Sequence, residues 1–223
     1  VMVNTLAALK KMGLNPKNVT AVVQGFGNVG SHAARLLSEQ GLKIVGIGDH
    51  TASFYNENGI DIKAALDFAS KNKNTLKGFT GATEIPSNQL LISKCDVLVP
   101  AALQNVITEE NAPKIQAKLI VEGANGPTRP EADVILNDKK IICVPDILAN
   151  SGGVTVSYFE WVQNKAGYYW TEDEVNTKHD HKMEIAFESV WNNAERFKTS
   201  MRIAAYITAL QKIEQAVKLK GAY

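Results

Sequence analysis

The stretch from residue 19 to residue 49, VTAVVQGFGNVGSHAARLLSEQGLKIVGIGD, constrains the fold of this chain more than any other. It holds an apolar run (19–23), the glycine pattern GFGNVG (25–30), a helical pattern and a second apolar run that ends at Asp49. A strand, a glycine-rich turn, a helix and a second strand within about 30 residues make a βαβ unit of the size that binds dinucleotides. We therefore predict a nucleotide site in this stretch.

The three glycines of the pattern each have a physical reason. Gly25 permits the tight turn out of the strand, Gly27 lets the backbone approach a pyrophosphate, and Gly30 lets the helix lie against the strand. The helix start then offers unpaired N–H groups and a positive dipole end to phosphates. We expect this helix to place Val29, Ala33, Leu36 and Leu37 on one apolar face and to end at Gly41.

The second strand ends in a carboxylate, Asp49, about 20 residues beyond the last glycine of the pattern. An acid at this position accepts hydrogen bonds from the hydroxyls of the adenosine ribose and repels a 2′-phosphate. We therefore expect NAD as the cofactor, with NADP possible if a lysine or arginine from elsewhere compensates.

The composition is that of an ordinary globular protein, with 45% hydrophobic and 21% charged residues. A net charge of +1 does not favour nucleic acid or a membrane surface as a partner. No apolar run is long enough to span a bilayer and no signal peptide is visible, so we expect a cytoplasmic protein. Cys95 and Cys143 are expected to be reduced thiols, and no metal site is expected.

Beyond Asp49 the pattern alternates between helical and strand-like segments. After a loop at 50–61, we predict helices at 62–69 (capped by Asp61), 87–93 (capped by Ser87), 108–115 and 131–137, and strands at 95–99, 118–121 and 141–144. A loop at 147–153 leads to a helix at 154–163. A second helix follows the capping box Thr171/Glu174, and the last helix covers 200–219. This order predicts an α/β fold: a Rossmann-type, mostly parallel sheet with helices on both faces, plus C-terminal helices, as a single domain over 1–223.

Two further features bear on the site and on the extent of the chain. The strand at 95–99 is followed by Ala101 and Ala102, whose small side chains let a ligand lie close to the sheet. The chain opens inside a helical pattern with no N-cap residue ahead of it, so we expect it to be a fragment.

Five motifs together resemble the cofactor domain of glutamate dehydrogenases, in the superfamily that includes leucine, phenylalanine and valine dehydrogenases. They are GFGNVG, CDVLVPAAL, EGANGPT, VPDILANSGGVTVSYFEW and MRIAAY, spread over nearly the whole chain. The resemblance implies oxidative deamination of L-glutamate to 2-oxoglutarate and ammonia, with hydride transfer to a nicotinamide, by a full-length homohexamer. It also implies that the N-terminal substrate and catalytic domain is absent here, so we expect no catalytic residue in this chain and no activity from it alone.

The resemblance also implies roles for individual residues. Asn28 matches a cofactor-binding residue, Asn125 one near the nicotinamide ribose, Asn150 one in the loop facing the cleft, and Ser157 one that contacts the side-chain carboxylate of the substrate. The expected cofactor-binding set is Gly25, Phe26, Gly27, Asn28, Val29, Gly30, Asp49, Ala101, Ala102 and Asn125.

Three alternatives are weighed against these expectations. One is a dehydrogenase of an apolar amino acid (leucine, valine or phenylalanine), which the hydroxyl of Ser157 disfavours. Another is a non-catalytic NAD(H)-sensing domain, which the glycine pattern allows but which leaves the segment LANSGGVTVSYFEW without a purpose. The third concerns Ser157 alone, whose hydroxyl could instead bond to its own helix backbone.

Overall fold

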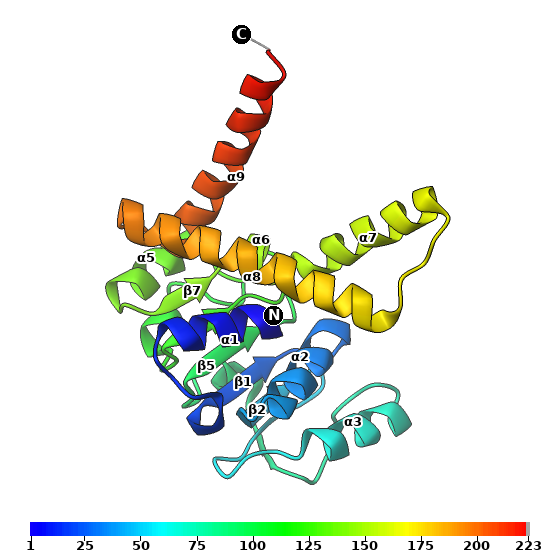
Figure 1. Ribbon diagram of the computed structural model, residues 1–223. Helices are drawn as coiled ribbons and strands as arrows, with labels where there is room; N and C mark the ends of the chain where they lie inside the picture. Colours follow the sequence, from blue (N-terminus) through cyan, green and yellow to red (C-terminus); the bar gives the residue numbers. More distant parts are fainter. Residues whose placement is uncertain (222–223) are drawn as a thin grey trace.

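The computed structural model describes residues 1–221, and within them a seven-stranded sheet carries helices on both faces (Figure 1). The strands are β1 (Thr20–Gln24), β2 (Lys43–Gly48), β3 (Ser53–Tyr55), β4 (Thr83–Ile85), β5 (Val97–Pro100), β6 (Leu119–Val121) and β7 (Ile142–Val144). Their order in the sheet is β4-β3-β2-β1-β5-β6-β7, and the five strands from β2 to β7 in this order pair in parallel. The predicted mostly parallel α/β fold is confirmed.

The helices are longest near the C-terminus. They are α1 (Met2–Lys11), α2 (Asn28–Glu39), α3 (Ile62–Lys71), α4 (Ser87–Leu90), α5 (Pro130–Asp138), α6 (Asp146–Ala149), α7 (Gly152–Ala166), α8 (Glu172–Phe197) and α9 (Met201–Leu219), with 3₁₀ turns at Pro16–Asn18 and Ala112–Lys114. None of the helices in residues 1–221 is both long and apolar enough to cross a membrane.

The sheet separates the apolar core into two layers, and the side chains of β1 alternate between them. Ala21 and Val23 lie in a cluster with residues of α1, α2 and α8, whereas Val22 lies in a second cluster with residues of α4 and α5. Successive strand residues point to opposite faces, so a strand buried on both faces reads as a continuous apolar run. Full burial of each such side chain contributes roughly 1.5–3 kcal/mol. The expectation of helices on both faces is confirmed.

The strand order creates a break in the winding beside β1. The chain passes from β1 to its neighbour β2 on one side, then returns to pair β5 on the other side of β1. Connections leave the carboxyl ends of β1 and β5 in opposite directions, and in such sheets a crevice opens at this switch point.

Several sequence predictions need correction. The segment 50–61, predicted as a loop, contains β3, which pairs antiparallel with both β2 and β4. Three-residue strands are too short to show a period, and neither β3 nor β4 was predicted. The predicted helix at 108–115 is wrong: Pro113 has no backbone N–H to donate, and the Asn111 side chain accepts the Thr108 N–H at 2.9 Å, which leaves only a 3₁₀ turn.

Two local assignments also shift. Ser87 is the first helical residue of α4 rather than its cap, which is Pro86, and the helix stops at Leu90. The start of the loop predicted at 147–153 is instead part of the short helix α6. By contrast, Asp61 caps α3 as predicted, with its carboxylate accepting the Ala64 N–H at 3.0 Å.

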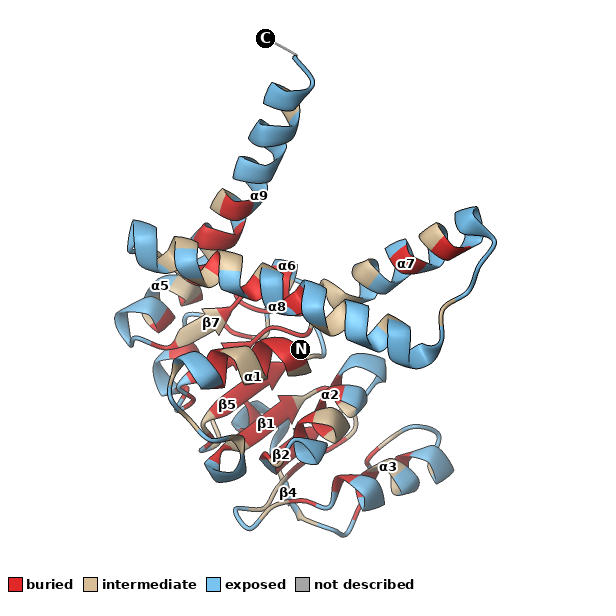
Figure 2. Ribbon diagram, viewed as in Figure 1, coloured by how far each residue is buried: buried red, intermediate tan, exposed pale blue. Residues whose placement is uncertain are grey.

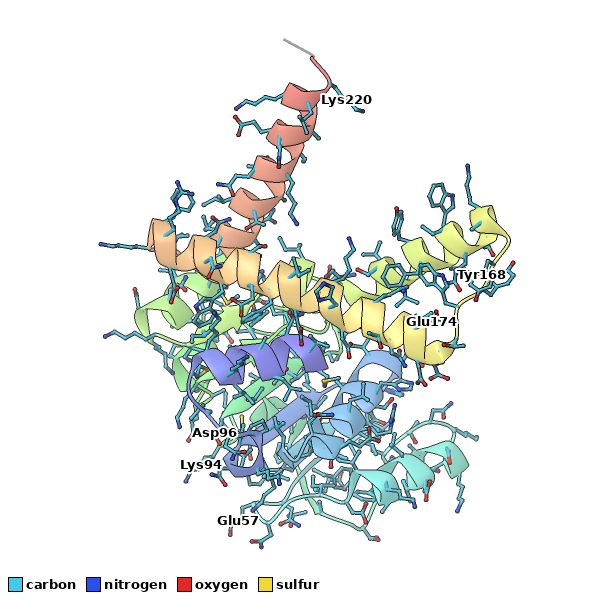
Figure 3. All side chains as sticks on the ribbon, viewed as in Figure 1. Glu57, Lys94, Asp96, Tyr168, Glu174 and Lys220 are labelled. Carbon is cyan, nitrogen blue, oxygen red and sulfur yellow. The ribbon has the colours of Figure 1, made fainter. Side chains whose placement is uncertain are left out.

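The C-terminal helices leave the sheet at its upper edge. The predicted capping box starts α8: the Thr171 hydroxyl accepts the Glu174 N–H at 3.3 Å, and the Glu174 carboxylate accepts the Thr171 N–H at 2.8 Å. Glu174 is labelled at this start of α8 in Figure 3. Helix α9 is buried only near its start, and its apolar stripe beyond residue 206, including Leu210 and Ile213, lies exposed as the helix projects away from the domain (Figure 2).

Candidate functional site

A cleft runs along the carboxyl edge of the sheet at the switch point. Its first part is a cavity of about 490 Å³ at the ends of β1, β2 and β5, and its second part is a cavity of about 600 Å³ that extends to the end of β6. The two cavities share four lining residues: Val29, Ala101, Ala102 and Leu103. We call the first part, around residues 25–29 and Asp49, the glycine end, and the second, around residues 123–125 and Asn150, the asparagine end.

The cleft gathers nearly all of the predicted cofactor residues. At the glycine end lie Gly25, Phe26, Gly27, Asn28, Val29, Asp49, Ala101 and Ala102. At the asparagine end lie Asn125 and Asn150. Gly30 lies behind the turn and Ser157 lies outside the residues that line the cleft.

Gly25 and Gly30 are required by the geometry of the turn. Gly25 has a φ of +98°, and a Cβ there would lie 2.7 Å from the backbone of Ala101. A Cβ at Gly30 would lie 1.9 Å from the carbonyl oxygen of Gly25. The roles predicted for these two glycines, a tight turn and close packing of helix against strand, are confirmed.

Gly27 differs, because nothing among the described residues would meet a Cβ placed on it within 4 Å. It is the N-cap of the 12-residue α2, where no side chain caps the helix and no acidic residue stands in the first turn. The first amides of α2 therefore face the cleft with no side-chain partner within residues 1–221. This cradle, which a side chain at Gly27 would partly fill, fits a pyrophosphate.

Val29 does not belong to the buried face of α2 that its spacing predicts. It is 46% exposed and lines both parts of the cleft, whereas Ala33 and Leu37 are buried as expected. The first turn of α2 lies at the rim of the cleft, so the apolar face begins only one turn later.

Asp49 is held by its own loop. Its Oδ1 accepts hydrogen bonds from the Thr51 N–H (2.6 Å), the Thr51 hydroxyl (2.6 Å) and the Ala52 N–H (3.0 Å), and its Oδ2 accepts one from the Leu76 N–H (2.7 Å). Burial acts to raise the pKa of Asp49, but these hydrogen bonds outweigh it and lower that pKa below its usual value. The group is a carboxylate at neutral pH, and Oδ2 retains room for a further donor such as a ribose hydroxyl.

Two amide side chains meet at the asparagine end. The Asn150 Nδ2 donates to the Asn125 Oδ1 at 2.7 Å, although the two residues are 25 positions apart in the chain. Asn125 is exposed at the tip of the loop that follows β6. The pair therefore presents polar groups to whatever occupies this part of the cleft.

Ser157 lies on α7 and is exposed. No side-chain hydrogen bond in residues 1–221 involves its hydroxyl, so the back-bonded alternative is not observed; Thr155 makes such a bond instead, to the Ser151 carbonyl at 2.9 Å. The contact of Ser157 with a substrate stays a prediction.

Sequence reasoning missed several residues that line the glycine end, among them Gln24, Ser53 and Ser87. Ser53 begins the short strand β3 and Ser87 begins α4, and both reach the cleft only through tertiary packing. Cys95 and Cys143 are free thiols, as predicted. Burial of the Cys95 thiol and, to a smaller extent, the negative charge of Asp96 raise the pKa of Cys95 to about 12.

The comparisons with known proteins agree with this geometry. The sequence model of the Glutamate/Leucine/Phenylalanine/Valine dehydrogenases matches residues 1–221. The chain is 45% identical over its whole length to the NAD-specific glutamate dehydrogenase of Clostridioides difficile, and 45% identical over 96% of its length to the catabolic NAD-specific glutamate dehydrogenase RocG of Bacillus subtilis. It spans 54% and 50% of these two proteins.

Solved structures give the same result. The glutamate dehydrogenase of Peptoniphilus asaccharolyticus is 41% identical with a TM-score of 0.86, over 100% of this chain and 52% of that one. The hetero-hexameric glutamate dehydrogenase of Thermus thermophilus, in its Leu-bound form, is 28% identical with a TM-score of 0.89, over 99% of this chain and 52% of that one. Because the family model matches residues 1–221, the chain belongs to the Glutamate/Leucine/Phenylalanine/Valine dehydrogenase family.

Proposed function

We propose that this chain is the NAD-binding part of a glutamate dehydrogenase, which deaminates L-glutamate oxidatively to 2-oxoglutarate and ammonia. The observation that carries the proposal is the convergence of the glycine turn, the uncapped start of α2 and Asp49 on one cleft at the switch point. The relatives at 45% identity are named NAD-specific glutamate dehydrogenases, which supports glutamate as the substrate and NAD as the cofactor.

The two ends of the cleft divide the cofactor between them. The amides at the start of α2 bind the pyrophosphate, and Gly27 leaves room for it. Asp49 accepts hydrogen bonds from the adenosine ribose and, as a carboxylate, repels a 2′-phosphate, so NADP binds more weakly. Asn125 and Asn150 then lie at the nicotinamide half, where NAD accepts the hydride when bound.

The remaining chemistry falls outside this chain. Deamination needs a base for the amino group and a cation for the substrate carboxylate. The described residues that line the cleft include no lysine or arginine. We place those groups in the other half of the protein, and we assign to Ser157 the contact with the side-chain carboxylate of glutamate.

For the full-length protein we propose a homohexamer in the cytoplasm. The hetero-hexameric glutamate dehydrogenase of Thermus thermophilus supports an assembly of six subunits, and the two free thiols support a reducing compartment. We expect the 223-residue chain alone to be monomeric or weakly associated, and a hexamer peak in sedimentation velocity would contradict this.

Calorimetric titration of this chain with NAD and with NADP tests the proposal. We expect NAD to bind and NADP to bind at least tenfold more weakly, with Gly27→Ala as a variant that keeps the fold and loses NAD. Absence of NAD binding, or a preference for NADP, would overturn the cofactor assignment. In the complete protein we expect glutamate-dependent NADH formation and none from this chain alone; turnover of leucine but not glutamate would favour the apolar alternative.

A further inference from the structure

The asparagine end of the cleft rests on a buried charge that belongs to no predicted site. Glu122 follows β6 directly and its side chain is fully buried. Arg202, in the first turn of α9 and 80 residues further along the chain, donates to both of its oxygens: Nη2 to Oε1 at 2.6 Å and Nη1 to Oε2 at 3.0 Å. Bidentate arginine–carboxylate pairs of this kind fix both the distance between the two groups and their relative orientation.

The same guanidinium holds two more carboxylates. Its Nε and Nη2 donate to Asp133 of α5, and its Nη1 lies 3.5 Å from the Oδ1 of Asp146 at the start of α6. Burial acts to lower the pKa of Arg202, but its bonds to Glu122 and Asp133 outweigh it and raise that pKa further. One permanent cation therefore gathers carboxylates from three separate segments of the chain.

From this cluster a continuous chain of hydrogen bonds leads to the cleft. The Asp146 N–H donates to the Glu122 Oε2 at 2.8 Å, and the Gly126 N–H donates to the Asp146 Oδ2 at 2.8 Å. Gly126 belongs to the loop of residues 123–127, whose first three residues line the asparagine end. Asp146 also begins α6, which leads directly to Asn150, the partner of Asn125.

This loop has no regular secondary structure of its own and is exposed at Asn125. Backbone bonds hold its two ends: the Gly123 and Ala124 N–H groups donate to the Pro100 carbonyl, and the Asn105 and Ile107 N–H groups donate to the Gly126 and Pro127 carbonyls. The Gly126 N–H, by contrast, is tied to the buried cluster through Asp146. At the glycine end, by contrast, the turn is fixed by backbone packing against Ala101, and none of the cluster's carboxylates lines that part of the cleft.

Resting on the proposed function, we infer that Arg202 is a positioning residue for the nicotinamide half of the cofactor, acting through Glu122 and Asp146 on the loop 123–127. Its loss releases the asparagine end of the cleft and leaves the glycine end in place. The ratio of the dissociation constants for NAD and for ADP, which lacks the nicotinamide and its ribose, reports this difference directly.

The test is calorimetric titration of this chain with NAD and with ADP, in wild type, Arg202→Met, Arg202→Lys and the control Lys212→Met. Lys212 is an exposed cation on the same helix with no ion pair in residues 1–221. In Arg202→Met we expect NAD to bind about fivefold more weakly, while the affinity for ADP changes less than twofold. Lysine keeps the positive charge but cannot donate two parallel hydrogen bonds as the guanidinium does. The NAD affinity of Arg202→Lys should therefore lie between those of wild type and Arg202→Met, and Lys212→Met should match wild type.

Equal losses for both ligands, or an unchanged NAD affinity in a folded Arg202→Met, would overturn the inference. If Arg202→Met does not fold, Asp146→Ala removes the last link to Gly126 and must show the same selective loss of NAD. A wild-type chain that binds neither ligand would instead reject the proposed function. In the complete enzyme we expect Arg202→Met to lower kcat about tenfold with a smaller change in KM for NAD, since a ring that is bound but poorly oriented reacts slowly.

Discussion

The two ends of the cleft are built in different ways. Most residues of the glycine end come from one βαβ unit between residues 20 and 49, and backbone geometry fixes its turn: a positive φ at Gly25, close packing at Gly30 and a helix start at Gly27. The asparagine end is assembled from the loops after β5 and β6 and from Asn150 at the end of α6, and the buried charge cluster around Arg202 of α9 ties the last two together. A local motif can thus dictate one half of a site while distant residues dictate the other.

This difference predicts how each end fails. A side chain that does not fit at the glycine end acts on the fold itself, because the turn follows β1, the central strand of the sheet, and packs against Ala101 after β5. Loss of charge at the asparagine end acts first on the loop 123–127, because the parallel strands beneath it keep their own hydrogen bonds. The following predictions test this contrast in order of decreasing effect.

The largest effect is expected from Gly30→Ala. Its Cβ would meet the Gly25 carbonyl oxygen at 1.9 Å, so α2 must move away from the turn. We expect a loss of about 3 kcal/mol in the free energy of unfolding, measured by urea denaturation, and no detectable NAD binding. Gly27→Ala is the matched variant: its Cβ meets no described residue, so stability should change little while NAD binding is lost. Equal stability losses in the two variants would contradict the assignment of their roles.

Arg202→Met should cost nearly as much stability, by another route. It leaves Glu122 buried without its cation, and breaking such pairs costs roughly 3 kcal/mol. Hydrogen exchange monitored by mass spectrometry should show faster exchange in residues 123–127 and unchanged exchange in residues 25–30. Faster exchange at both ends would mean that the two ends are one cooperative unit.

Asp49→Asn is expected to have an intermediate effect, and one that depends on pH. An amide has a single acceptor oxygen, so either the Leu76 N–H or the Thr51 and Ala52 N–H groups would face an NH₂ group. We expect a loss of about 1–2 kcal/mol in the free energy of unfolding at pH 7. The lowered pKa of Asp49 means that its contribution is complete above the unfolded-state value, near pH 4, and disappears as the pH falls through the folded-state value. The gap between wild type and variant should therefore narrow below about pH 4; a gap that is constant with pH would show that ionisation of Asp49 is not involved.

The smallest effect is expected from Asn150→Ala. It removes the 2.7 Å bond to Asn125, which lies at an exposed position, so the free energy of unfolding should change by about 0.5 kcal/mol or less. We expect NAD affinity to fall about threefold and ADP affinity to stay the same. A larger loss for ADP than for NAD would place the asparagine end at the wrong half of the cofactor.

The same contrast explains what could be predicted from the sequence. The βαβ unit, the packing roles of Gly25 and Gly30, and the Asp61 and Thr171 caps depend on residues close in the sequence, and the structure confirms them. The strands β3 and β4 were missed because their pairing is long-range and their length is three residues. The link from Arg202 to Glu122 spans 80 residues, and a single arginine in a helical pattern gives no sign of its partner.

Amide chemical shifts recorded on this chain during titration with NAD, and separately with AMP, show whether one cofactor occupies both ends of the cleft. We predict that NAD shifts the amides of residues 27–30 and of residues 123–126, whereas AMP shifts only amides at the glycine end. In both titrations the exposed part of α9 beyond residue 210 should stay unchanged. Shifts confined to one end with NAD, or shifts at residues 123–126 with AMP, would contradict a cofactor that lies across both ends of the cleft.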